Sequence, residues 1–174
     1  MAVGMDSASD NVILTSPDGI TWTPYGSPIG TGGLRAVAYG GGYFVAVGAG
    51  GVIRYSSDGG TNWNPGISGT FVNLNAITYG NSEFAAAGDS SSILISPNGS
   101  SWAASAVNPT GGSFSGIAYG NSTFVAVEDF SGFYYSTTSA GTTFNLATTI
   151  TPFRKQFLWR FCHICPKRVC RGEY

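Results

Sequence analysis

The sequence repeats itself at an interval of 40 residues over most of its length. The clearest copies are residues 36–40, 76–80 and 116–120, which all end in Tyr-Gly and are all followed by an apolar run that contains phenylalanine. Serines at the same phase stand at positions 16, 56, 96 and 136. Self-similarity at this period indicates an architecture of repeated supersecondary units. The repeat therefore constrains the fold tightly and the function only loosely.

Each repeat predicts one antiparallel unit of four short strands. Two apolar runs are joined by Gly40-Gly41-Gly42 in one copy and by Gly-Asn-Ser in the later two, and these residues accept the positive φ of a tight hairpin turn. A third run ends at the in-phase serine, and residues 63–67 and 102–107 would form less regular fourth strands. No helical period is sustained. The chain is predicted to be all-β, with units at about 1–33, 34–73, 74–113 and 114–151, of which the first begins in mid-unit.

The apolar runs leave no polar face. Residues 44–47, for example, read Phe-Val-Ala-Val. In a sheet with one solvent-exposed face, polar and apolar residues would alternate along each strand. Sheets buried on both faces suit the four-stranded blades of a β-propeller, and a parallel β-helix is the alternative architecture. Six in-phase rings are expected to be largely buried: Tyr39, Tyr79, Tyr119, Phe44, Phe84 and Phe124.

Three of the in-phase serines open a longer motif. Residues 56–63 match the pattern Ser-x-Asp-x-Gly-x-x-Trp in full, residues 16–22 and 96–102 are one residue shorter, and the copy after Ser136 has lost its aspartate and tryptophan. Over about residues 2–150 the chain therefore resembles the Asp-box (BNR) repeat β-propellers of the sialidase-like and YVTN-like repeat superfamily, which includes sialidases, other glycosidases and photosystem assembly factors. The resemblance implies a structural turn between the third and fourth strands. Its residues are Ser16, Asp18, Gly19, Trp22, Ser56, Asp58, Gly59, Gly60, Trp63, Ser96, Asn98, Gly99 and Trp102.

The charge and hydropathy of the chain limit the kinds of partner that it is expected to bind. Residues 1–151 carry two basic and eight acidic side chains, a net −6, whereas residues 152–174 have a net +5. An acidic body argues against nucleic acid as its partner. No run reaches transmembrane length, and the first residues lack the features of a signal peptide, although the resembled proteins are mostly secreted or on cell surfaces.

A catalytic role is not expected. A sialidase-like site needs a cluster of arginines, a tyrosine paired with a glutamate, and an acid, and residues 1–151 have only Arg35 and Arg54 and no histidine. Asp18 and Asp58 occupy equivalent points of separate units, which favours a turn role over catalysis or metal binding. No catalytic residue, metal or cofactor is predicted.

A non-catalytic binding or scaffold module is the favoured function, with a carbohydrate or a protein as ligand. Candidate contacts are residues that break the repeat, because aromatic rings beside acidic groups suit stacking on a sugar. They are Tyr25, Glu83, Asp89, Glu128, Asp129 and Phe130. The alternatives are a fragment of a sialidase-like glycoside hydrolase and a truncated propeller gene product without a selected function.

The repeat stops at Pro152, and residues 152–174 are basic and aromatic. They hold Cys162, Cys165, Cys170 and the only histidine, His163. Three interpretations stay open: a zinc site, a membrane-surface or nucleic-acid segment, and an out-of-frame extension foreign to the repeat.

The two ends of the repeat array are expected to expose apolar faces. Two chains could complete one ring of about eight units, or residues 157–161 could patch a distorted ring of four. A homo-oligomer, namely a dimer that completes the ring, is the favoured state.

Overall fold

The computed structural model describes residues 1–8, 10–25, 32–108, 112–129, 132–136 and 143–147. Within these ranges every regular element is a β-strand except one short 3-10 turn, η1 (Ala49–Gly51). The predicted all-β class is confirmed. Phe130 and residues 152–174, with their cysteines and histidine, lie outside the described ranges.

The strands form four sheets in chain order; the first three are antiparallel meanders, and the fourth is a meander with one further strand added in parallel. The first sheet holds β1 (Ala2–Met5), β2 (Asn11–Thr15) and β3 (Thr23–Pro24). The second holds β4 (Leu34–Gly40), β5 (Tyr43–Gly48), β6 (Ile53–Ser56) and β7 (Asn64–Pro65), and the third holds β8 (Leu74–Gly80), β9 (Glu83–Gly88), β10 (Ile93–Ser96) and β11 (Ala103–Ala104). The fourth holds β13 (Phe114–Gly120), β14 (Thr123–Glu128), β15 (Phe133–Ser136) and β16 (Thr143–Leu146), together with β12 (Ala106–Asn108).

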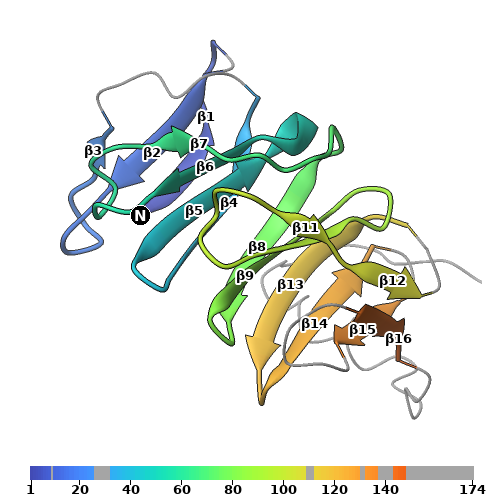
Figure 1. Ribbon diagram of the computed structural model, residues 1–174. Coiled ribbons are helices and arrows are strands. Elements are labelled where there is room, and N and C mark those ends of the chain that lie inside the picture. Colours follow the sequence, from blue (N-terminus) through green and yellow to red (C-terminus); the bar gives the residue numbers. More distant parts are fainter. Residues whose placement is uncertain (9, 26–31, 109–111, 130–131, 137–142, 148–174) are drawn as a thin grey trace, which may run out of the picture.

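The sheets stand in a row, with the first and fourth at opposite ends (Figure 1). The opening strands β4, β8 and β13 contact one another in turn. A closed ring of four units would require the end sheets to meet, and the described residues do not bring them together. Residues 157–161, which that alternative uses, lie outside the described part of the chain.

The strand expected over residues 102–107 is in fact two strands in two sheets. β11 is the edge of the third sheet, whereas β12 crosses to the fourth and pairs in parallel with β16, Val107 opposite Phe144. Ile67 makes the same kind of crossing through a parallel bridge to Ser101. The segment that leaves each of these fourth strands therefore fastens its sheet to the next one.

The predicted hairpin turns are present between the first two strands of the second, third and fourth sheets. Gly41 and Gly42 have φ of +57° and +86°. Asn81 and Ser82 take the same positions with φ of +49° and +64°. Positive φ at both central residues matches the right-handed twist of the paired strands, so these turns fix the register of each opening hairpin.

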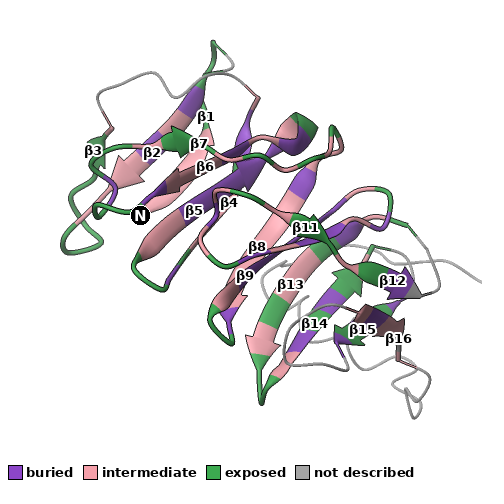
Figure 2. Ribbon diagram, in the orientation of Figure 1, coloured by how far each residue is buried: buried purple, intermediate pink, exposed green. Residues whose placement is uncertain are grey.

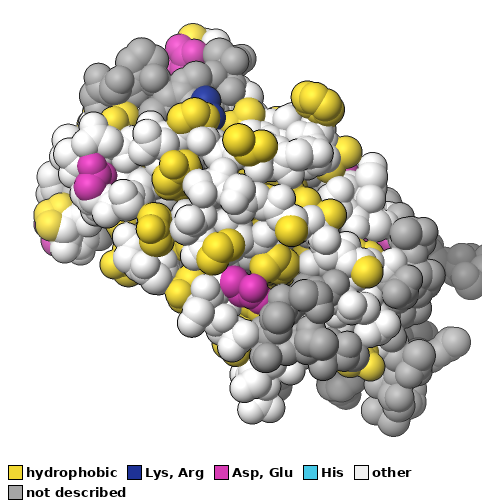
Figure 3. Space-filling model, in the orientation of Figure 1, with side chains coloured by type: hydrophobic (Ala, Val, Ile, Leu, Met, Phe, Trp, Pro, Cys, Tyr) yellow, Lys and Arg dark blue, Asp and Glu magenta, His cyan; other side chains and the backbone are white. Residues whose placement is uncertain are grey.

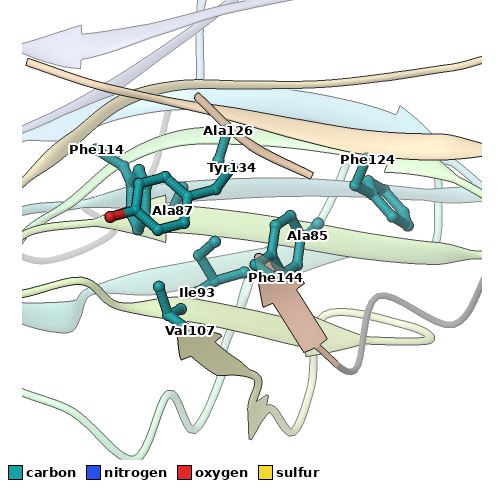
Figure 4. Packing of buried hydrophobic residues seen from close by; sticks show 9 residues of the cluster. All are labelled: Ala85, Ala87, Ile93, Val107, Phe114, Phe124, Ala126, Tyr134 and Phe144. Carbon is teal, nitrogen blue, oxygen red and sulfur yellow. The ribbon is translucent and has the colours of Figure 1, made fainter. Parts of the chain in front are cut away.

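The core lies between the sheets, so the middle sheets are buried on both faces (Figure 2). One cluster joins residues of the second and third sheets, and another joins the third and fourth. In the latter, Ala85 and Ala87 of β9 lie among Phe114, Phe144 and Tyr134 (Figure 4). Small side chains on one sheet opposite rings on the next allow close approach, which accounts for apolar runs without a polar face.

The repeated Tyr-Gly pair is explained by contact between neighbouring units. A Cβ added to Gly40 would overlap the ring of Tyr79, and a Cβ added to Gly80 would overlap the ring of Tyr119. A Cβ on Gly120 would meet nothing within 4 Å. The tyrosine of one unit thus packs on the glycine of the preceding unit, and Gly120 has no such ring above it among the described residues.

This packing corrects one prediction about the six in-phase rings. Phe84 and Phe124 are fully buried, and Phe44, Tyr79 and Tyr119 are partly buried, but Tyr39 is 60% exposed. The first sheet opens with β1, which corresponds to a second strand, so its described residues provide no glycine beneath Tyr39. The sequence around the tyrosine is similar in all three copies, so it does not show whether a neighbouring strand packs on that ring.

Candidate functional site

The three serine–tryptophan turns (residues 16–22, 56–63 and 96–102) share one pattern of hydrogen bonds. Each serine Oγ accepts a bond from a glycine amide; the donors and distances are Gly19 to Ser16, 2.8 Å, Gly60 to Ser56, 2.9 Å, and Gly99 to Ser96, 2.8 Å. Each tryptophan indole N–H donates to the carbonyl of the same glycine; the pairs are Trp22 and Gly19, Trp63 and Gly60, and Trp102 and Gly99, at 3.0–3.1 Å. These side chains are engaged in holding the turn.

The aspartates of two of these turns are also engaged. Asp58 Oδ1 and Oδ2 accept bonds from the amide and side chain of Asn62 at 2.9 and 2.7 Å, which lowers the pKa of Asp58 to about 2, with Ser56 contributing. The backbone amides of Thr21 and Ile20 likewise lower the pKa of Asp18. Carboxylates held ionised in this way are poor proton donors near neutral pH.

A polar network joins three sheets at the end opposite the hairpin turns. Asp89 accepts bonds from the side-chain amides of Asn75 at 2.9 Å and Asn73 at 2.7 Å, which together lower its pKa. Asn75 also donates to the carbonyl of Phe114 and accepts a bond from Arg35. Asp89, which was predicted as a ligand contact, lies within this network. Asn73 and Asn75 were not among the predicted residues, although they replace Gly33 and Arg35 of the preceding copy.

The other predicted contacts that the structure describes do not all lie at the same end of the sheets as Asp89. Glu128 and Asp129 lie at the same end of the sheets, where Glu128 accepts a bond from the Gly112 amide and the Asp129 amide donates to Ser113. Glu83 lies at the opposite end, opposite Gly80 in the hairpin.

Glu83 and Tyr25, two of the predicted contacts, are partly buried. Burial raises the pKa of Glu83, whose Oε1 is buried without a hydrogen-bond partner. Tyr25 is partly buried against the cluster of Ile13, Leu34 and Ala46, and its amide donates to the Ile13 carbonyl at 2.8 Å.

A cavity of about 520 Å³ opens at the same end as the network. Its two walls are residues 50–54, which include the end of η1 and the start of β6, and residues 66–71, which connect β7 to β8. Gly51, with φ of +74°, allows the walls to touch, because a Cβ there would overlap the Thr70 carbonyl. This volume lies in the usual range for ligand sites, about 300–1,000 Å³.

Two large apolar side chains stand out from this connection: Phe71 is 95% exposed and Ile67 is 75% exposed. Sequence reasoning missed both residues. The available signal was the break in the repeat, because Phe71 stands where the neighbouring copies have Thr31 and Gly111.

No group of three or more metal-ligating side chains occurs among the described residues. In the same part of the chain, no helix has the length and apolarity needed to cross a membrane.

Comparison with known proteins places the fold. No protein-family model matches the sequence, and no curated protein is similar to it. Solved structures do match: YCF48 bound to D1 peptide (21% identity, TM-score 0.54, 65% of this chain and 40% of that chain), the GH74 enzyme of Niastella koreensis (28%, 0.54, 78% and 22%), and YCF48 from Cyanidioschyzon merolae (16%, 0.53, 86% and 56%). These are β-propeller proteins. The chain has a β-propeller fold, and it spans between about a fifth and just over half of these matched chains.

Proposed function

We propose that this chain is a non-catalytic binding module built from Asp-box propeller repeats, and that its ligand is a segment of another protein. The observation that carries the proposal is the cavity beside Phe71, where apolar side chains are presented to solvent by an ordered connection. The likeness to a YCF48 structure with a bound D1 peptide supports a protein ligand.

The Asp-box assignment is supported by the hydrogen bonds of the three turns. The serine and tryptophan of each turn bond within that turn, as do Asp18 and Asp58 in two of them. The turns stand on separate sheets. Residues so engaged stabilise the scaffold, and the ligand contacts come from residues that break the repeat.

A carbohydrate is the second candidate ligand, because the chain is also similar to a GH74 enzyme over 78% of its length. Under this proposal, glycans would bind without being cleaved. The hydrogen bonds of Asp58 support the non-catalytic assignment, because its carboxylate is already engaged with Ser56 and Asn62 of its own turn.

The test is a binding screen of the full chain against a peptide array and a glycan array, with hydrolysis measured on the glycans that bind. Saturable binding to peptides, without turnover of any glycan, is expected. Turnover that is lost on changing Asp58 or Arg54, or the absence of any ligand on both arrays, would contradict the proposal.

We further propose that two copies associate through the outer face of the fourth sheet. Val125 and Val127 of β14 lie opposite Tyr135 and Phe133 of β15, and all four side chains are exposed. The equivalent residues of the third sheet are buried or packed against the fourth sheet. Light scattering is expected to give the mass of a dimer, and Val127→Lys is expected to give a monomer; a monomeric wild-type chain would refute the association.

A further inference from the structure

Residues 66–71, which form one wall of the cavity, are fixed to the second and third sheets by hydrogen bonds. The Gly66 amide donates to the Ile53 carbonyl at 3.1 Å, and the Ile67 amide donates to the Ser100 carbonyl at 2.8 Å. The Thr70 hydroxyl oxygen accepts a bond from the Val72 amide at 3.3 Å. Phe71 therefore faces water on a fixed backbone, and a partner would lose little conformational freedom of this protein on binding.

The walls of the cavity combine apolar surface with one positive charge. Figure 3 shows hydrophobic side chains at the surface over the region of η1 and the β7–β8 connection. Among the described residues that line the cavity, Arg54 is the only charged side chain. Because residues 1–151 carry eight acidic side chains and only two basic ones, the cavity is a local exception to an acidic surface. This charge attracts a carboxylate.

The lining favours a polypeptide over a sugar. It contains no carboxylate and no carboxamide among its described residues, whereas sugar hydroxyls are usually held by such planar polar groups. An exposed aromatic ring such as Phe71 also suits a sugar, but no carboxylate or carboxamide lies beside it in the described lining to hold the sugar hydroxyls. Apolar side chains beside an arginine are instead typical of the energetic centre of protein interfaces.

We infer that this cavity binds an extended protein segment that carries an aromatic residue next to a carboxylate. The aromatic side chain packs on Phe71 and Ile67, and the carboxylate pairs with Arg54. This inference rests on the proposed function and specifies its site and the chemistry of its ligand.

The test uses three pools of short fluorescent peptides with randomised flanks around a fixed pair, Phe-Glu, Phe-Lys or Ser-Glu. Fluorescence anisotropy with the full chain is expected to show the tightest binding for the Phe-Glu pool. Phe71→Ala is expected to weaken that binding by about tenfold or more, the scale for an aromatic anchor. Ile20→Ala is the matched control, because Ile20 is an exposed apolar side chain on a turn of the first unit, and no change is expected.

Charge is tested separately at Arg54. Arg54→Gln is expected to abolish the preference for Phe-Glu over Phe-Lys, and Arg54→Glu is expected to reverse it. Because Arg54 is half-buried and donates to the Ile53 carbonyl, thermal unfolding of both variants must show that they fold. Amide chemical shifts in residues 50–54 and 66–71 should respond to the Phe-Glu pool.

The outcomes separate the inference from the proposed function. If the array peptides bind but Phe71→Ala binds them as the wild type does, or if the shifts map elsewhere, the cavity is not the site and the binding function stands. Equal affinity for all three pools, or no affinity for any of them, overturns the inference as well. If neither array yields a ligand, the proposed function fails.

Discussion

The contact between tyrosine and glycine of neighbouring units predicts opposite effects for two identical substitutions. Gly80 and Gly120 both occur in the sequence Tyr-Gly-Asn-Ser and both end the opening strand of their sheet. A Cβ on Gly80 would overlap the ring of Tyr119, whereas a Cβ on Gly120 would meet open space. Gly80→Ala should therefore destabilise the fold, and Gly120→Ala should not.

The expected loss of stability is the cost of displacing the ring of Tyr119 from its contacts. Forcing an added methyl group into a packed contact costs about 1–3 kcal/mol. The ring of Tyr119 also packs on Phe124 with centroids 4.7 Å apart, and displacing it weakens an aromatic contact worth about 0.5–1.5 kcal/mol. We expect Gly80→Ala to lower the free energy of unfolding by about 2–4 kcal/mol. Gly120→Ala restricts the unfolded chain and is expected to range from neutral to about 1 kcal/mol stabilising.

Urea unfolding followed by tryptophan fluorescence measures both variants. The double variant Gly80→Ala with Tyr119→Ala is the internal control, because without the ring the added methyl group has room. The cost of Gly80→Ala in that background should fall below about 1 kcal/mol. Equal effects of Gly80→Ala and Gly120→Ala, or no coupling to Tyr119, would refute the packing explanation of the repeat.

Three further predictions concern single side chains. Ser56→Ala should cost about 1–3 kcal/mol in urea because the buried Gly60 amide loses its acceptor, whereas the same change at Ser16, where the bond is exposed, should cost less; equal costs would contradict this. The Asp58 carboxyl should titrate in NMR near its folded pKa of about 2, below its ordinary 3.8, so its contribution to stability is complete above pH 3.8 and is lost as the pH falls toward 2; Asp58→Asn should remove this acid sensitivity. The pKa of Glu83 is raised, so the stability that its protonated form contributes is present at low pH and is lost as the pH rises above 4.5. Glu83→Gln should therefore be more stable than the wild type at pH 7 in urea unfolding. A less stable variant would show that the Glu83 carboxylate has a partner.

The scaffold could be predicted because its signals are local and repeated. The hairpin turns at residues 40–43, 80–83 and 120–123 depend on glycine, asparagine and serine at positive φ, and apolarity on both faces indicates stacked sheets. The same pattern occurs in three copies, so an ambiguous assignment in one copy is resolved by the other two.

The exceptions arose where the environment of a copy differs from that of its neighbours. Tyr39 has the same sequence context as Tyr79 and Tyr119, yet its ring is exposed because no described glycine lies beneath it. The crossing of β12 to the fourth sheet depends on pairing with β16, which lies far along the chain. Such features are set by which unit stands next to which, and a local pattern does not contain that information.

Departure from the repeat does not by itself identify a ligand contact in this scaffold. Asn73 and Asn75 depart from both neighbouring copies, and Asp89 departs from Ala49 of the preceding copy. Yet all three use their polar groups on one another or on the fourth sheet. Phe71 also departs from the repeat, and its ring packs on almost nothing within its own chain. Exposing a large ring on a fixed backbone stabilises nothing in the fold, because the hydrophobic effect acts against it. A non-repeated side chain is therefore a candidate ligand contact only where it has few partners within its own chain. Phe71 meets that criterion, which is why we propose the connection between β7 and β8 as the binding surface.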